Sequence, residues 1–208
     1  FYKSFKIIII YLRTYWYFKL IYIYEIDNYF YIVLQSINLS MKNFEKSICI
    51  ALNNLASNNK VIFYIFRSIT YTGEWWMYVV YGIIITIIDY HKGYEALQMG
   101  LIAYGMHYPI YFLIKNMSKR NRPFEKYENI NALVKPPDKY SLPSGHSSAS
   151  TISALIIISV FGSMKLLIIW PITVGLSRVV LGMHYPSDSI IGIILGYMCY
   201  YVSALILI

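Results

Sequence analysis

Long apolar blocks separated by short polar stretches dominate this chain, and they predict a set of membrane-spanning helices. One block runs from Trp75 to Ile88 and begins with two adjacent tryptophans, residues typical of a membrane interface. Further apolar runs cover about 96–114, 147–161, 166–180 and 187–208. The runs at 147–161 and 166–180 are shorter than the roughly 20 residues that a full crossing needs, so their helices are expected to begin within neighbouring polar sequence.

The pattern before these blocks is different. Residues 43–70 mix polar and apolar positions at short intervals, which predicts one or two helices that lie at the membrane interface rather than across it. Thr72-Gly73 ends this pattern. A polar turn is expected at 89–95 and a long polar loop at 115–140.

Residues 1–40 contain no Ala, Gly or Pro and consist mostly of Ile, Tyr, Phe, Leu, Lys and Asn. This bias is of the low-complexity kind, and no small-residue cleavage site follows the apolar stretch as in a signal peptide. We therefore divide the chain into a segment 1–40, either an additional membrane-associated segment or not part of the native protein, and a membrane domain over 41–208.

Composition supports the membrane assignment, because 58% of the residues are hydrophobic and 13% are charged, whereas a soluble domain carries roughly a quarter charged residues. We expect an all-α, multi-pass bundle. The net charge of +8 arises from Lys and Arg at the ends of apolar runs. Anionic membrane lipids or a phosphate substrate, and not nucleic acid, are therefore the expected partners. Cys49 and Cys199 have no metal-binding spacing and are interpreted as buried thiols.

The order of the predicted spans brings three polar blocks to one membrane face. Lys115 ends the second span, and the loop after it carries Arg122 and the sequence 143–146. The third span leaves that face and the fourth returns to it, which places Arg178 and His184 beside the first two blocks. A functional site at one membrane face follows from this count.

These blocks contain groups suited to binding a phosphate. Lys115, Arg122 and Arg178 supply cationic donors, and a guanidinium group can bind phosphate oxygens in pairs. Gly145 lies at the start of an expected helix, where backbone N–H groups can approach a phosphate. Ser144 adds a hydroxyl donor. We therefore predict a site that binds the three equatorial oxygens of a phosphoryl group.

The start of the last span carries candidates for covalent chemistry. Pro186 is suited to the first turn of a helix, which leaves His184 in an extended conformation ahead of it. Asp188 then falls in that first turn and can reach back to His184. A carboxylate bonded to one ring nitrogen leaves the other nitrogen free to attack phosphorus. His146 remains as the general acid that protonates the departing alkoxide.

The three blocks resemble one family pattern. The sequence elements are Lys115-x6-Arg122-Pro123, Pro143-Ser144-Gly145-His146 and Ser177-Arg178-x5-His184-x3-Asp188. This pattern is similar to that of the type 2 phosphatidic acid phosphatase superfamily, a group that includes membrane lipid phosphatases, glucose-6-phosphatase and vanadium haloperoxidases. The resemblance covers about 70–190 and leaves 1–40 outside.

The resemblance implies an all-helical membrane bundle of about six helices, compared with the five spans counted above. It implies that His184 is the nucleophile that forms a phosphohistidine, that Asp188 orients it and that His146 is the acid. The residues that it assigns to phosphate binding are Lys115, Arg122, Ser144, Gly145 and Arg178. It also implies that neither a metal nor another cofactor takes part.

We therefore expect an integral membrane phosphatase that hydrolyses a lipid phosphate monoester or diphosphate. Polyprenyl diphosphate of the undecaprenyl type, phosphatidate and phosphatidylglycerophosphate are candidate substrates, since the motifs specify phosphate and not its tail or the oligomeric state. Alternatives are a catalytically silent protein that binds or transports lipid phosphates, a phosphatase for a small soluble phosphate ester, and a haloperoxidase. The complete set of His146, His184 and Asp188 argues against a silent protein, because binding alone needs only the cations.

Three other polar positions receive structural interpretations. Lys119 and Arg120 are interpreted as a solvated or headgroup-facing pair. His107 is expected to bond a backbone carbonyl freed by Pro109. Glu74, beside the tryptophans, is interpreted as favouring a helix start or lining the site, with no catalytic role.

The orientation of the site has two opposing indications. The basic residues of the loop at 115–140 favour a cytoplasmic site by the positive-inside rule. Several of these charges are explained by phosphate binding, however, and bacterial members of the family that this chain resembles often place the site outside. We expect a bacterial cell membrane protein with its site facing outside.

Overall fold

The computed structural model describes residues 39–207. Contacts within the chain divide it into a unit that ends at Phe44 and a compact unit from Glu45 onward, which contains every predicted site residue. The segment 1–40 lies outside the described residues except for its last two positions, so the expectation for it stays a prediction. The description below concerns the unit from Glu45.

Helices form all the regular secondary structure of residues 39–207, which confirms the all-α class. The unit from Glu45 begins in a helix that continues to residue 58. The elements that follow are α2 (Lys60–Thr72), α3 (Trp75–Ile88), α4 (Tyr90–Ser118), α5 (Pro123–Lys126), α6 (Gly145–Phe161), the 3-10 helix η1 (Lys165–Ile168), α7 (Ile169–Val180) and α8 (Pro186–Leu207).

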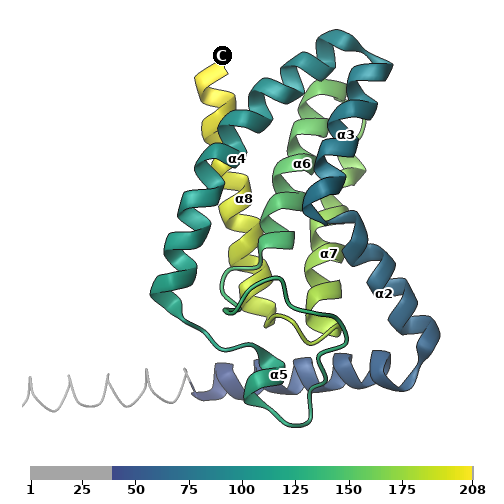
Figure 1. Cartoon of the computed structure of the whole chain (residues 1–208), viewed down its shortest axis with the longest axis vertical. Helices are drawn as coiled ribbons and strands as arrows, with labels where there is room; N and C mark the ends of the chain where they lie inside the picture. Colours follow the sequence, from purple (N-terminus) through teal and green to yellow (C-terminus); the bar gives the residue numbers. More distant parts are fainter. Residues whose placement is uncertain (1–38, 208) are drawn as a thin grey trace, which may run out of the picture. The chain divides into compact units, whose positions relative to one another are not determined.

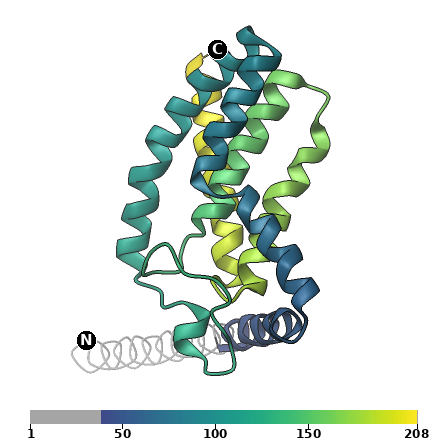
Figure 2. The same cartoon turned by 45° about the vertical axis from the view of Figure 1, so that its right-hand side comes forward.

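The long helices run side by side as a bundle (Figures 1 and 2), with α6 in contact with α3, α4, α7 and α8. The helix over 45–58 crosses the lower end of the bundle, close to the short α5. One or two helices were predicted over 43–70, and the structure has two before Gly73, the helix that ends at residue 58 and α2. Their position at a membrane surface stays a prediction.

Small residues allow α6 and α8 to pack closely. A Cβ atom added at Gly192 would lie 2.5 Å from the Ser144 carbonyl oxygen, and one at Gly196 would lie 2.3 Å from that of Ser148. Such distances exclude any side chain at the two glycines, as is common where membrane helices approach. The N-terminal ends of α6 and α8 carry two of the three motifs, so this packing holds the two motifs next to each other.

The helices α3, α4, α6 and α8, and η1 with α7, lie at the five predicted spans. Judged by length and composition, α8 is the only helix within residues 39–207 that is both long and apolar enough to cross a membrane. The helices α3 and α6 are apolar but shorter. The number of membrane crossings therefore stays a prediction.

Two predicted loop boundaries are wrong. The region 89–95 is not a turn, because α4 already begins at Tyr90 and the Asp89 side chain caps it by accepting a hydrogen bond from the Lys92 N–H (3.1 Å). The loop expected from Lys115 begins later, since α4 continues to Ser118. In both places polar residues at a helix end were interpreted as loop.

Candidate active site

The three motif blocks meet at the lower end of the bundle in Figure 1, where α4 and α7 end and α6 and α8 begin. The Ser144 N–H donates to the Asp188 carbonyl oxygen at 3.0 Å. The Arg122 guanidinium nitrogen lies 3.4 Å from Nε2 of His184. The predicted convergence of these blocks at one end of the bundle is therefore confirmed.

A glycine turn after α7 sets the position of His184. Gly182 adopts a left-handed conformation with φ of 80°, and a Cβ atom there would lie 2.3 Å from the Asn131 carbonyl oxygen. Only glycine satisfies both conditions without strain. The chain then folds back, so that the His184 N–H bonds to the Arg178 carbonyl oxygen at 3.3 Å. The turn thus places the histidine beside the end of α7.

Asp188 lies against the other side of His184, in the first turn of α8 as predicted. Its Oδ2 accepts a hydrogen bond from the Tyr185 N–H at 2.8 Å and lies 3.6 Å from Nδ1 of His184. Burial, reinforced by the Arg178 charge and opposed by Asp188, lowers the pKa of His184 to about 3. The imidazole is therefore neutral near pH 7, with Nε2 on the side of Arg122.

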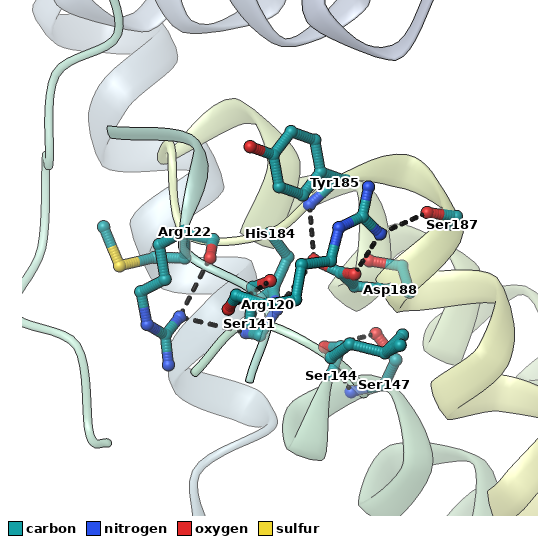
Figure 3. A network of polar contacts seen from close by, with 12 residues as sticks. Arg120, Arg122, Ser141, Ser144, Ser147, His184, Tyr185, Ser187 and Asp188 are labelled. Atoms are coloured by element: carbon teal, nitrogen blue, oxygen red, sulfur yellow. Dashed lines mark hydrogen bonds and ion pairs between the residues drawn. The ribbon is translucent and has the colours of Figure 1, made fainter. Parts of the chain in front are cut away.

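Arg120 belongs to this site and not to the lipid headgroups (Figure 3). One of its nitrogens lies 2.6 Å from Oδ1 of Asp188 and 2.7 Å from Oγ of Ser187, and another lies 2.6 Å from a Glu45 carboxylate oxygen. Burial would lower the pKa of Arg120, but the two carboxylates raise it above its ordinary value. The predicted headgroup-facing role is wrong for Arg120, whereas Lys119 is exposed as expected.

Asp138 pairs with two of the predicted phosphate-binding cations. Its Oδ2 lies 2.6 Å from Nζ of Lys115 and its Oδ1 lies 2.6 Å from the Arg122 guanidinium. The Tyr111 hydroxyl donates to the same carboxylate at 2.6 Å. Burial would raise the pKa of Asp138, but the bonds from Lys115 and Tyr111 hold it below its usual value. These contacts could not be predicted from local patterns, because 23 residues separate Asp138 from Lys115.

Arg178 is the third predicted cation and differs from the other two. Its side chain is almost fully buried, and its Nε and one terminal nitrogen have no hydrogen-bond partner among residues 39–207. A buried guanidinium with unpaired N–H groups is costly unless an anion completes it. Arg178 and Arg122 both act electrostatically on His184, so together they are the candidate anion-binding position of this site.

The start of α6 lies at the same site, beside Asp188. Ser144 caps this helix, and its hydroxyl oxygen accepts a bond from the Ser147 hydroxyl at 2.8 Å (Figure 3). A Cβ at Gly145 would lie 3.2 Å from the Tyr111 side chain, so little space is left beside it. The first N–H groups of a helix have no partner within the helix and favour an anion.

His146 has a carboxylate partner that was not predicted. Its Nε2 lies 3.3 Å from Oε1 of Glu74, and its side chain is 11% exposed. Glu74 stands at the N-cap of α3, yet its side chain makes no capping bond there. Of the two interpretations of Glu74, the structure supports lining of the site.

His107 lies deeper in the bundle and pairs with a side chain. Its Nε2 lies 2.7 Å from Oγ of Ser148 on α6. The predicted bond to a backbone carbonyl near Pro109 is therefore wrong. The contact joins two polar side chains of the neighbouring helices α4 and α6.

The helix over 45–58 supports the site from below. The buried amide of Asn53 donates to the carbonyl oxygens of Asn131 (3.0 Å) and Val180 (3.1 Å) and accepts from the Asn131 N–H (2.8 Å). These bonds tie the basic loop to the end of α7. Cys49 and Cys199 are free and buried, as predicted, and burial raises the pKa of the Cys49 thiol to about 12.

A metal site was not predicted, and within residues 39–207 no group of three or more His, Cys, Asp and Glu side chains could hold a metal ion. The charged and ionisable groups of the site are four cations (Lys115, Arg120, Arg122 and Arg178), two histidines (His146 and His184) and four carboxylates (Glu45, Glu74, Asp138 and Asp188). Whether catalysis is independent of metal stays a prediction.

Comparison with known proteins places this arrangement in a family. The family model described as the PAP2 superfamily matches residues 96–207. A decaprenylphosphoryl-5-phosphoribose phosphatase from Mycobacterium tuberculosis is 36% identical over 102 residues, which cover 49% of this chain and 55% of the relative. The protein of the same name from Mycolicibacterium smegmatis is 34% identical over 80 residues, covering 38% and 43%. The chain thus spans about half the length of the curated relatives that it matches.

Two solved structures share the fold. A transmembrane PAP2-type phosphatidylglycerolphosphate phosphatase from Bacillus subtilis superposes with a TM-score of 0.65 at 21% identity, covering 79% of this chain and 85% of that one. LpxE from Aquifex aeolicus superposes with a TM-score of 0.62 at 20% identity, covering 76% and 93%. At this level of identity the likeness concerns the helical fold alone.

Proposed function

The chain belongs to the PAP2 superfamily, and on this basis we propose that it is an integral membrane phosphatase that hydrolyses a phosphate monoester or diphosphate on a lipid. The observation that carries this proposal is the buried guanidinium of Arg178, whose unpaired N–H groups lie next to the neutral imidazole of His184. A phosphoryl group is the ligand that would use both, because it needs cationic donors for its oxygens and a nucleophile for its phosphorus.

In the proposed first step, Nε2 of His184 attacks phosphorus and the bond from phosphorus to the lipid oxygen breaks. Asp188 holds the proton of Nδ1, so that the attacking nitrogen keeps its lone pair. Lys115, Arg122, Arg178 and the N-terminus of α6 with Ser144 and Gly145 stabilise the phosphoryl oxygens. The product of this step is a phosphohistidine and a lipid alcohol, or a lipid monophosphate where the substrate is a diphosphate.

His146 is proposed to act in both steps. It gives its proton to the leaving oxygen, and in the second step it accepts a proton from the water that attacks the phosphohistidine. Release of inorganic phosphate returns His184 to its neutral form. The scheme needs no metal, and turnover in EDTA would support this point, whereas a strict Mg²⁺ requirement would contradict it.

A lipid substrate is supported by an apolar groove that begins at the site. A cavity of about 930 Å³ lies between α3, α4 and α6 and is lined mainly by apolar residues. Its lining includes Gly145 and Tyr111, next to the proposed phosphate-binding residues, and continues to Ile85 and Gly93 near the opposite ends of α3 and α4. A small soluble phosphate ester would leave this groove unused. Exposed Ile, Leu and Val side chains along the outer helices support a position in the membrane.

The substrate class is proposed from the same groove and from the relatives. The names of the mycobacterial relatives point to polyprenyl phosphates, and that of the Bacillus protein to a glycerophospholipid. We favour a polyprenyl phosphate or diphosphate, with phosphatidate and phosphatidylglycerophosphate as the alternatives. The proposed location is the bacterial cell membrane, with the site on the outer face.

The test is phosphate release by the purified protein from these lipids, compared with His184→Ala. Release by the wild-type protein that is lost in the variant would support the function. Binding of a lipid phosphate without release would instead indicate the silent binding or transport protein. Turnover that persists in His184→Ala would overturn the assignment of the nucleophile.

A further inference from the structure

We propose that Glu74 is the positioning residue for the general acid His146, holding its ring in place and stabilising its protonated form. The inference deepens the proposed function and rests on it. Two residues that the chain order keeps far apart, 72 positions from each other, are brought together by the contact of the α2–α3 junction with the start of α6.

The geometry of the junction favours this contact over a capping role. Glu74 immediately precedes α3, where a carboxylate commonly accepts bonds from the first N–H groups of its own helix. Its side chain makes no such bond and lies with Oε1 3.3 Å from Nε2 of His146. The neighbouring Gly73 packs on the ring, since a Cβ atom there would lie 3.6 Å from Cδ2 of His146.

The charges around His146 explain why an anion is needed. Burial and the charges of Arg178 on α7 and Arg122 in the basic loop lower the pKa of His146 to about 4, so its imidazolium form is disfavoured in the free site. Glu74, from the α2–α3 junction, is the anion that faces it. The hydrogen bond from His146 lowers the pKa of Glu74 even though burial opposes this shift, so the carboxylate is charged at neutral pH.

The contact also gives the two ring nitrogens of His146 different roles. A protonated imidazole has two N–H donors, and the contact with Glu74 engages the one on Nε2. The N–H on Nδ1 is then the donor to the leaving oxygen. As Nε2 of His184 bonds to phosphorus and the P–O bond breaks, that oxygen takes the Nδ1 proton and Glu74 keeps its charge. Water returns a proton to His146 in the second step.

The consequence is that each histidine has its own carboxylate, suited to a different task. Asp188 is fully buried beside a histidine that must stay neutral to attack. Glu74 is one-third exposed beside a histidine that must carry a proton and exchange it with water. The more open position suits a group whose charge has to change in every cycle.

The experiment compares Glu74→Gln with the wild-type protein on two substrates. One is an alkyl phosphate such as dodecyl phosphate, whose alkoxide needs a proton to leave. The other is p-nitrophenyl phosphate, which leaves as a stable anion. We expect kcat/KM to fall about tenfold on the alkyl substrate and to change little on the aryl one. The alkaline limb of the alkyl pH profile should move about one unit to lower pH.

Equal losses on both substrates, or an unmoved alkaline limb, would overturn the inference, because a structural defect does not depend on the leaving group. Glu95→Gln, on the exposed surface of α4, is the matched control. His146→Ala separates the two levels of the argument. A loss that depends on the leaving group in His146→Ala but not in Glu74→Gln would overturn the role of Glu74 alone. Equal losses in His146→Ala would overturn the acid assignment in the proposed function.

Discussion

Asp138 and Asp188 are both carboxylates paired with arginine at the same site, but they are built into it differently. Asp138 lies on the loop before α6, is 30% exposed and bridges Lys115 and Arg122. Asp188 lies in the first turn of α8, is fully buried and bridges His184 and Arg120. One carboxylate is therefore held on a partly open loop, and the other is enclosed within a helix terminus.

This difference suggests different relations to the substrate. Asp138 occupies donors that the proposed mechanism assigns to phosphate, so substrate oxygens and Asp138 compete for the same N–H groups. In the proposed mechanism the phosphate does not use the donors that Asp188 contacts, so we expect these bonds to persist through the reaction. The predictions below test this division between an exchangeable anion and a permanent one.

The largest effect is expected for Asp188→Asn. The amide keeps the shape of the side chain but cannot stabilise the His184 proton in the same way, so kcat for phosphate release should fall on the order of 10²–10⁴-fold. Phosphate release at saturating lipid measures the loss. Circular dichroism of the variant serves as the folding control, and a well-folded variant with nearly full activity would contradict the orienting role.

Arg120→Met should have the next largest effect, about tenfold on kcat, because it removes the bonds at 2.6 Å and 2.7 Å that fix Asp188 and Ser187. The effect should be much smaller when Asp188 is already Asn, because Arg120 is expected to act by holding Asp188 in place. A double-mutant cycle of kcat values measures this coupling. Losses that simply multiply would show that Arg120 acts independently of Asp188, and Lys119→Met is the control for charge.

Asp138→Asn should change the binding of anions more than the rate. With its negative charge removed, Lys115 and Arg122 are free for the oxygens of a phosphate analogue, so the inhibition constant of vanadate should fall several-fold. Inhibition curves for the two proteins give this value. Weaker inhibition by vanadate would mean that Asp138 prepares the cations instead of competing for them. Glu128→Gln, at an exposed position of the same loop, is the matched control for charge.

The smallest effect concerns stability against acid. The pKa of His184 is about 3 in the folded protein, compared with its ordinary value of 6.5. Between these two pH values the imidazole is protonated in the unfolded chain but not in the folded protein. The free energy of unfolding should therefore decrease as the pH falls through this window. Thermal unfolding at pH 6.5 and 4.5 should show a smaller decrease of Tm in His184→Ala than in the wild-type protein. Parallel decreases would contradict the lowered pKa.

Local geometry explains which parts of the site could be predicted from the sequence. His184 and Asp188 are four residues apart across a helix start, and Ser144, Gly145 and His146 are consecutive, so their mutual positions follow from helix geometry. The convergence of the three blocks followed from the alternation of spans. The all-helical fold was predictable for the same reason, because long apolar blocks leave few other structures.

The missed partners are all distant in sequence. Glu74, Arg120 and Asp138 reach their partners across 72, 68 and 23 residues, respectively. Those contacts depend on how the α2–α3 junction and the basic loop fold over the ends of α6 and α8. No periodicity or spacing in the sequence encodes that arrangement. Arg120, which lies in a basic loop, was therefore interpreted as a solvated or headgroup-facing residue.

The close approach of α6 and α8 also limits how such a protein can diverge. Gly192 lies one turn beyond Asp188 and packs against the backbone of Ser144, the N-cap of α6, so a larger side chain there would push the starts of α6 and α8 apart. Residues along the apolar groove can vary with the lipid. Descendants that acquire new substrates are therefore expected to change their groove residues while keeping glycine at 192 and 196.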